Sequence, residues 1–291
     1  MNFYYKYRFV ILCLYKGGRA AKEEEEFMKR TVRSLIDAKK PFIGTLMQFP
    51  SVELTEMFAY TGFDFLIMDM EHGLIENKDA LEMVRDCEIH NTAAMIRVPQ
   101  VDEEKIKKAL DMGASGLLIA GVHSYADAVN AVKYAKFKPV GVRGACPAVR
   151  ANHFGLDDHV SYYEKQNRET VLFVALEGPE VVKEIDRIAG IEGIDIIGVG
   201  PVDMALALGV PGQVNAPVVR EAIARVKTTA NANGKLYASF SNYIADFIES
   251  DEPADFYMVA GDTWLIADML KTVQEDLEKL RAKDAAAERG L

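Results

Sequence analysis

Short, almost continuously apolar runs alternate with longer amphipathic stretches from residue 40 onward. The apolar runs lie at 42–48, 65–70, 93–98, 116–121, 171–177, 194–199, 235–240 and 256–260. Such continuous hydrophobicity is typical of parallel strands covered on both faces. Helical patterns fill the intervals, at 76–90, 103–112, 124–135, 179–189 and 215–232. Eight strand–helix units predict an α/β fold of the closed (β/α)8 type, a TIM barrel, rather than an open sheet.

Local signals support several of these helices. Ser124 precedes one helical stretch and Asp127 follows three residues later, a capping-box-like start. Gly113 and Gly234 stand where helix C-caps belong. The interval 136–170 is long for a barrel loop, and loops of this length are usually functional. We expect one barrel domain over residues 28–282, with a closing helix at 262–280 and a tail at 283–291.

Residues 1–27 have a different character. The apolar run 9–15 follows basic residues, but it is too short to span a bilayer, and the glycines after it make a poor signal-peptide cleavage site. The acidic run 22–26 could be encoded by purine-rich codons resembling a bacterial ribosome-binding site, just before Met28. We therefore expect residues 1–27 to be a non-native or disordered extension. Mass spectrometry of the natively expressed protein would contradict this by detecting a peptide from them.

Composition narrows the class of protein. Of 291 residues, 49% are hydrophobic and 27% are charged, which is typical of a soluble globular protein. The net charge of −10 argues against a nucleic-acid partner, which would need a basic surface for phosphates. The three cysteines show no CxxC spacing, so neither a disulfide framework nor a zinc site is indicated. We expect a cytoplasmic protein without a membrane partner.

Polar side chains follow the predicted strands, and four strand ends carry most of the charge. These residues are Asp69, Glu71 and His72 after the second strand, Arg97 at the third, Glu177 at the fifth and Asp203 after the sixth. The other four ends offer Gln48, His123, Ser239 and Asp262. Active sites of (β/α)8 barrels lie at the C-terminal ends of the strands, and buried charges are costly unless paired or bound to metal. The charged cluster is therefore the candidate site.

Each charged residue has a chemical interpretation. Glu177 and Asp203 are candidate metal ligands, because two carboxylates with waters and substrate oxygens suit Mg²⁺ or Mn²⁺. The alternative is an acidic pair bound to Arg97 without metal. Arg97 could stabilise a developing enolate or form a structural ion pair. His72 is the candidate general base, and Asp69 could orient it or order nearby waters.

Two loops add further candidates. The turn 200–203 runs into a helix whose free N–H groups could receive a carboxylate, with a simple strand-to-helix turn as the alternative. Arg143 and Arg150 could shape the barrel entrance or be solvated surface residues. His153 could approach the mouth of the barrel.

Four segments occur in a characteristic order. They are FDFLIMDMEHGLIE (63–76), MIRVPQVDEEKIKKALDMGASGLLIAGV (95–122), KPVGVRGACPAVRA (138–151) and IDIIGVGPVDMALALG (194–209). With the Leu-Glu pair at 176–177, they resemble the HpcH/HpaI aldolase family, metal-dependent class II pyruvate aldolases such as 4-hydroxy-2-oxoheptanedioate aldolase. The resemblance implies a barrel of the phosphoenolpyruvate/pyruvate type. It also implies a divalent cofactor, Mg²⁺, Mn²⁺ or Co²⁺, at Glu177 and Asp203.

The resemblance implies roles for the other residues. Arg97 would stabilise the enolate, and His72 with Asp69 would form the acid/base relay. The backbone at Gly200, Pro201 and Val202 would receive the pyruvate carboxylate. Asp111 would enter a neighbouring subunit's site in a homo-oligomer, a hexamer or trimer.

Two positions depart from the family pattern. Close relatives usually carry glutamine where this chain has Ala175, and often tryptophan near Leu46. Both positions would contact substrate, so the acceptor and the reaction direction stay open.

The leading hypothesis is retro-aldol cleavage of a 4-hydroxy-2-oxo acid to pyruvate and an aldehyde, or the reverse, through a metal-bound pyruvate enolate. One alternative forms the same enolate by decarboxylating an oxaloacetate-type 2-oxo acid. Another is a barrel that binds a keto acid without catalysis. Metal-dependent deuterium exchange at the pyruvate methyl separates both enzymes from a binding protein.

Overall fold

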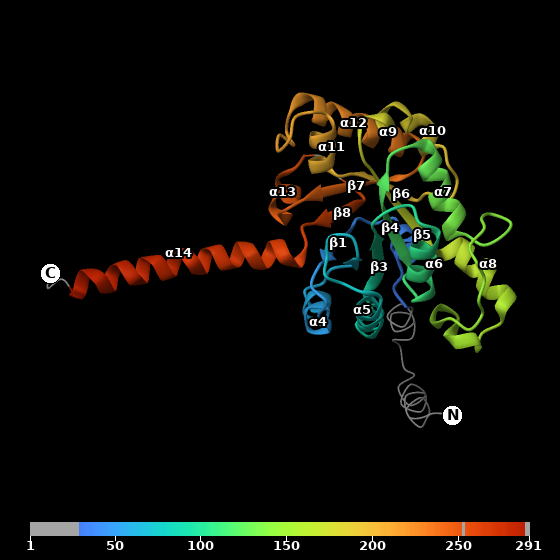
Figure 1. The fold of residues 1–291 in the computed structure, drawn as a ribbon, viewed down its shortest axis with the longest axis horizontal. Coiled ribbons are helices and arrows are strands. Elements are labelled where there is room, and N and C mark those ends of the chain that lie inside the picture. The colour runs from blue at the N-terminus through green and yellow to red at the C-terminus, as the bar shows by residue number, and fades with distance from the viewer. Residues whose placement is uncertain (1–28, 252–253, 289–291) are drawn as a thin grey trace, which may run out of the picture. The chain divides into compact units, whose positions relative to one another are not determined.

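The computed structural model describes residues 29–251 and 254–288, in which parallel strands close into a barrel (Figure 1). Strands pair in sequence order, and β1 closes the ring by pairing with β8. They are β1 (Phe42–Met47), β2 (Phe65–Asp69), β3 (Ala93–Val98), β4 (Gly116–Val122), β5 (Val171–Leu176), β6 (Ile196–Val199), β7 (Leu236–Ser241) and β8 (Phe256–Val259). The predicted (β/α)8 barrel is confirmed, and every predicted strand end lies within two residues of an observed one.

Helices alternate with the strands, and most of them cover the outside of the barrel, whereas the long last helix runs away from it (Figure 1). They are α3 (Val32–Asp37), α4 (Val52–Tyr60), α5 (Asn77–Ile89), α6 (Glu103–Asp111), α7 (Tyr125–Ala135), η1 (Arg150–Gly155), α8 (His159–Glu169), α9 (Pro179–Lys183), α10 (Ile185–Ala189), α11 (Pro201–Ala207), α12 (Pro217–Ala232), α13 (Ile244–Glu249) and α14 (Asp262–Glu288). The expected caps are present: the Ser124 hydroxyl accepts the Asp127 N–H, and Gly113 takes φ +100 after α6.

Three predicted segments differ from the observed ones. The single helix expected at 179–189 is two short helices, α9 and α10, because the backbone leaves helical geometry at Glu184 (φ −95, ψ 4). The interval 136–170 contains η1 and α8. Helix α14 continues to Glu288 instead of ending before a tail, and three consecutive alanines, the best helix formers, lie in the extension.

Aromatic rings fill the N-terminal end of the barrel. Phe65 and Phe256, the first residues of β2 and β8, stack with ring centroids 4.8 Å apart. Phe42 and Phe173 pack edge-on against Phe256 at 5.2 and 5.4 Å. Gly44 makes room for this cluster, since a Cβ there would lie 2.3 Å from the Phe65 ring. The aromatic packing leaves the C-terminal strand ends for the polar residues.

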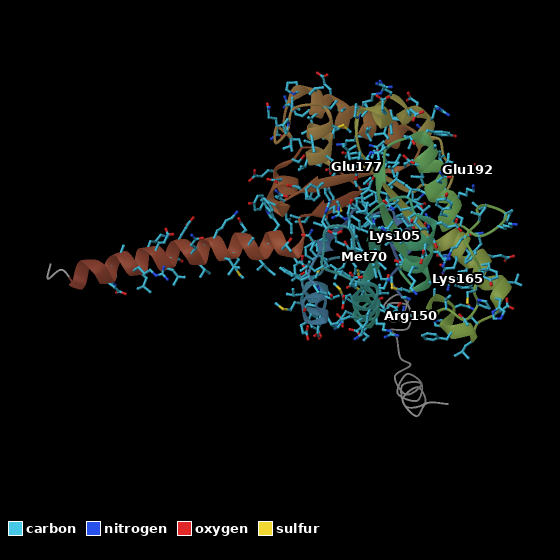
Figure 2. All side chains as sticks on the ribbon, viewed as in Figure 1. Met70, Lys105, Arg150, Lys165, Glu177 and Glu192 are labelled. Atoms are coloured by element: carbon cyan, nitrogen blue, oxygen red, sulfur yellow. The ribbon has the colours of Figure 1, made fainter. Side chains whose placement is uncertain are left out.

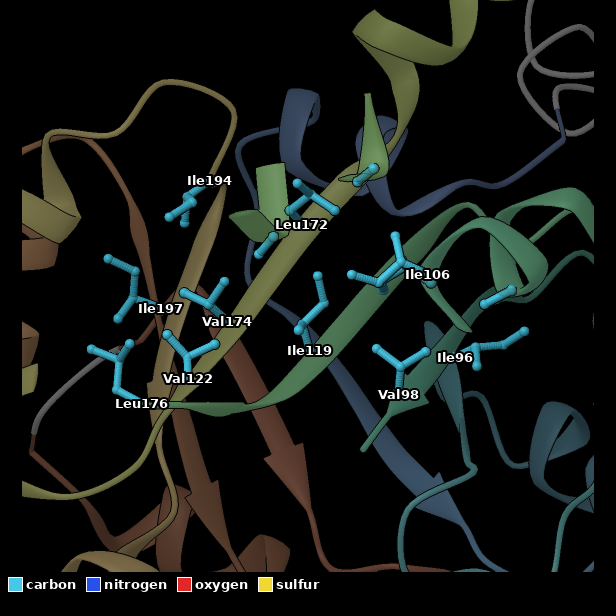
Figure 3. Packing of buried hydrophobic residues seen from close by; sticks show 14 of the residues in the cluster. Ile96, Val98, Ile106, Ile119, Val122, Leu172, Val174, Leu176, Ile194 and Ile197 are labelled. Carbon is cyan, nitrogen blue, oxygen red and sulfur yellow. The ribbon is translucent and has the colours of Figure 1, made fainter. Parts of the chain in front are cut away.

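A second apolar layer lies between the strands and the surrounding helices. Figure 3 shows aliphatic side chains of this layer, including Ile96, Ile119, Val174 and Ile197 from neighbouring strands. Because β1 to β6 are buried on both faces, these strands need the continuous apolar sequence from which they were predicted.

From residue 31 onward, the described residues belong to one unit that contains the whole barrel. The expectation for residues 1–27 concerns a segment outside the described residues. Within the described part of the chain, no helix is long and apolar enough to cross a membrane.

Candidate active site

Asp69 and Arg97 form a buried pair at the ends of β2 and β3. They are register partners in the sheet, and Arg97 Nε and Nη2 donate to the two Asp69 oxygens at 2.7 and 2.5 Å. Asp69 is fully buried, and the Arg97 side chain is 16% exposed. Burial raises the pKa of Asp69, but the bonds and charge of Arg97, aided by two backbone amides, bring it below its ordinary value. The bidentate fork fixes the guanidinium plane.

The turn after β2 presents Glu71 and His72. The N–H groups of both donate to Asp69 Oδ1, at 3.0 and 3.2 Å, so this carboxylate organises the turn. Glu71 Oε2 lies 3.3 Å from Arg97 Nη1 and 3.7 Å from His72 Nε2. Burial raises the pKa of Glu71; Arg97 and His72 oppose this, and Glu177 adds to it. Asp69 thus contacts the backbone of His72 and not its ring. The exposed imidazole of His72 lies beside the Glu71 carboxylate.

Gln48 and Asp262, weak candidates on sequence grounds, connect β1 and β8 to this network. Gln48 Nε2 donates to Asp69 Oδ2 at 3.0 Å, and its Oε1 accepts the Thr263 hydroxyl. Buried Asp262 accepts the backbone N–H groups of Gln48, Phe49 and Thr263 at 2.8, 3.0 and 2.7 Å. Burial raises the pKa of Asp262, against the effect of these amides. The signal for both residues was their position at the C-terminal end of a predicted strand: Gln48 is the last residue of 42–48, and Asp262 comes two residues after 256–260.

Glu177 directly follows β5 and is hydrogen-bonded to the end of β4; its side chain is labelled in Figure 2. The Glu177 N–H donates to Val122 O at 3.0 Å, and the Gly121 N–H donates to Glu177 Oε1 at 3.1 Å. His123 Nδ1 lies 3.0 Å from the Glu177 carbonyl oxygen. The β4–β5 register shifts between Ile119 and Val122, and Gly121 takes φ +66 there. The irregularity brings the Gly121 amide to the carboxylate.

The end of β6 lies beside Glu177. The last residues of β5 and β6 are register partners, so Glu177 and Gly200, which follow them, are adjacent at one end of the barrel. Gly200 is the N-cap of α11. A Cβ on Gly200 would lie 2.7 Å from Asp203 Oδ2, so the Asp203 carboxylate lies over this glycine. The strand ends that carry Glu71, Glu177 and Asp203 therefore converge.

Glu177 and Asp203 fit a hard divalent cation that takes further ligands from water and substrate. Mg²⁺ is commonly bound by one or two carboxylates together with such oxygens. Among the residues that the structure describes, no group of three or more His, Cys, Asp or Glu is arranged to hold a metal ion. Two carboxylates alone would leave coordination positions for other ligands, as in an open site rather than a closed structural one.

Asp111 and the two arginines of the segment between α7 and β5 make other contacts. The buried side chain of Arg143 donates through Nη2 to Asp111 Oδ1 at 2.7 Å. Arg150 donates to both Glu88 oxygens at 3.1 and 2.5 Å, and it lies well apart from Glu177 (Figure 2). The arginines anchor this segment to α6 and α5, so the alternative that both are solvated surface residues is wrong.

The remaining sequence candidates occupy different surroundings. Leu46 belongs to the apolar cluster inside the barrel and Ala175 packs against it. Ala175 lies two residues before Glu177 on β5, and alternate residues of a strand share a face. Val202 is 62% exposed on α11. The His153 side chain is 72% exposed and pairs with Asp157 of the same loop at 2.7 Å.

The chain is similar to known proteins over most of its length. Residues 47–250 match the family model for HpcH/HpaI aldolase/citrate lyase. Identity to a hydroxypyruvate/pyruvate aldolase of Sagittula stellata is 33% over 195 residues, covering 67% of this chain and 76% of that protein. Identity to a 5-keto-4-deoxy-D-glucarate aldolase of Escherichia fergusonii is 35% over 210 residues, covering 72% and 81%. An HpcH/HpaI aldolase/citrate lyase family structure from Burkholderia cenocepacia has a TM-score of 0.78 and 29% identity, covering 86% of this chain and 98% of that one.

Proposed function

The chain belongs to the HpcH/HpaI aldolase/citrate lyase family, and from this premise we propose that it is a divalent-metal-dependent pyruvate aldolase. It is a carbon–carbon lyase, as are the aldolases that it resembles. The proposed reaction cleaves a 4-hydroxy-2-oxo acid to pyruvate and an aldehyde, or joins the two. The relatives are named for hydroxypyruvate, pyruvate and 5-keto-4-deoxy-D-glucarate, which supports a small oxo acid as substrate.

Glu177 and Asp203 are the proposed metal ligands. Glu177 follows the strand residue paired with the one before Gly200, and the Asp203 carboxylate lies over Gly200, which supports this pairing. A divalent cation there would supply positive charge that polarises the keto group of the 2-oxo acid. The backbone N–H groups of Gly200 and Val202 would receive the substrate carboxylate; Pro201 has no N–H to contribute.

Arg97 is the proposed stabiliser of the enolate oxygen. A guanidinium has five N–H groups. Asp69 accepts from Nε and Nη2 of Arg97, and Glu71 lies beside Nη1. The remaining N–H groups can face a developing oxyanion without reorientation, because Asp69 already fixes the plane. Such preorganised donors contribute most where charge develops during the reaction.

His72 is the proposed proton carrier. In cleavage, a base takes the proton of the 4-hydroxyl, the bond between C3 and C4 breaks, and the aldehyde leaves. The enolate that remains is then protonated at C3 to give pyruvate. The exposed imidazole of His72, with Nε2 near the Glu71 carboxylate, suits both transfers.

The observation that carries the proposal is the convergence of the Asp69–Arg97 pair and Glu177 at the strand ends of a family member. The test incubates the purified protein and Mg²⁺, Mn²⁺ or Co²⁺ with pyruvate and a panel of aldehydes, and in parallel with oxaloacetate or 4-hydroxy-2-oxo acids, and identifies products by mass spectrometry. We expect metal-dependent aldol products. Oxaloacetate turnover well above that of any hydroxy-oxo acid would instead make the protein a decarboxylase. If no substrate is turned over, the proposal that the protein catalyses this reaction is contradicted.

A further inference from the structure

His123 contacts Glu177 but has no part in the reaction steps proposed above. It follows β4 and comes directly before Ser124, the N-cap of α7. Its backbone N–H donates to Asp127 Oδ2 at 3.1 Å, which ties it to the first turn of that helix. Its imidazole extends in another direction, to the residue at the end of β5.

The imidazole reaches both the backbone and the carboxylate of Glu177. Nδ1 lies 3.0 Å from the Glu177 carbonyl oxygen, and Nε2 lies 3.8 Å from Oε2. A carbonyl oxygen only accepts, so Nδ1 carries the proton in this hydrogen bond. One side chain therefore restrains the main chain of Glu177 while it borders the carboxylate.

Glu177 needs such a restraint because it lies just beyond the paired part of β5. Its N–H is bonded to Val122 O, and its Oε1 accepts the Gly121 N–H. The His123 ring supplies the contact on the carbonyl side. Together, three successive residues of β4 and its end restrict the rotation of Glu177 about its backbone and side-chain bonds.

We propose that His123 is a positioning residue for Glu177 and thereby strengthens divalent-metal binding at the strand ends. The inference rests on the proposed function, because it takes Glu177 as a metal ligand. Partners that orient metal ligands typically contribute about 10–100-fold to metal affinity. The His123 side chain is 64% exposed, so its hydrogen bond competes with water, and we expect an effect of about tenfold.

A purely structural role at the start of α7 would give a different result. The Ser124 hydroxyl and Asp127 form the cap through their own side chains, and His123 joins it only through its backbone N–H. Replacing the His123 ring leaves these cap contacts in place. Loss of the ring should therefore affect metal affinity more than thermal stability.

The test measures Mn²⁺ binding by electron paramagnetic resonance in the full chain and in four variants, with the thermal midpoint recorded for each. His123→Ala should raise the Mn²⁺ Kd about tenfold with little change in the midpoint. His123→Gln should recover most of the loss, because its amide can donate to the same carbonyl. His153→Ala is the matched control, since that histidine is also exposed and pairs with Asp157 of its own loop; its Kd should match that of the unaltered protein.

The variant Glu177→Gln distinguishes a failure of the proposed metal site from a failure of the positioning role of His123. If it retains the original Mn²⁺ affinity, the metal site of the proposed function is wrong. If Glu177→Gln loses binding while His123→Ala retains it, only the positioning role of His123 is wrong. Equal losses in His123→Ala and His153→Ala, or no recovery in His123→Gln, would also overturn that role.

Discussion

Replacing Arg97 with methionine should destabilise the barrel, because Asp69 would lose its charged partner. Methionine keeps an apolar stem but removes both hydrogen bonds to the fully buried carboxylate. Removing one partner of a buried ion pair costs about 3–5 kcal/mol, since the other charge is left uncompensated. The N–H groups of Glu71 and His72 and the Gln48 amide still donate to Asp69. We therefore expect the lower end, about 3 kcal/mol.

The same substitution should change how stability depends on pH. The lowered pKa of Asp69 means that its contribution to folding is present above about pH 4 and is lost as pH falls through the lowered value. Without Arg97, burial would dominate and raise the pKa. The folded variant would then favour the protonated acid, and it would lose stability as pH rises above about 4. The difference in unfolding free energy between the two proteins should thus be larger at neutral pH than in acid.

Urea unfolding followed by circular dichroism at pH 7 and at about pH 4.5 measures both effects, with the lower value chosen near the ordinary carboxyl range. A double variant, Asp69→Asn with Arg97→Met, is the control. It should be more stable than Arg97→Met alone at neutral pH, because no unpaired charge stays buried. A loss below about 1 kcal/mol, as for an exposed pair, would show that Asp69 does not need Arg97 to compensate its charge. So would a loss of equal size at both pH values.

Three further substitutions test other parts of the structure. Gly200→Ala should displace the Asp203 carboxylate, whose Oδ2 would lie 2.7 Å from the new Cβ, and weaken Mn²⁺ binding; unchanged affinity by paramagnetic resonance would contradict this. Phe256→Ala should cost about 3–5 kcal/mol in urea unfolding, because it opens a cavity beside the stacked ring of Phe65. His72→Ala should lower turnover about 100-fold in steady-state assays while Mn²⁺ affinity is kept, and full activity would exclude it as the proton carrier.

The barrel could be predicted from the sequence because strands buried on both faces need unbroken apolar runs. The strand-end cluster was predictable for a related reason. Parallel strands of a closed barrel all end at one rim, so polar residues at their C-terminal ends, such as Asp69 and Arg97, come together wherever they lie in the chain.

The partners within the cluster could not be predicted. The Asp69 carboxylate bonds to the Arg97 guanidinium and to the backbone of His72, whereas a relay with the His72 ring was expected. Asp262 and Gln48 are bonded across 214 positions of sequence, a separation over which no spacing rule applies. Which of these residues become hydrogen-bond partners depends on side-chain geometry at the end of the closed barrel, and residue types alone do not specify that geometry.

In the proposed reaction, Glu177 and a divalent metal together allow the protein to remove a proton from pyruvate. Exchange of the pyruvate methyl protons in heavy water, followed by nuclear magnetic resonance, measures this step. We expect exchange with Mg²⁺ that stops after chelation, returns when metal is restored, and is absent in Glu177→Gln. Exchange that persists after chelation, or that proceeds at the original rate in Glu177→Gln, would contradict it.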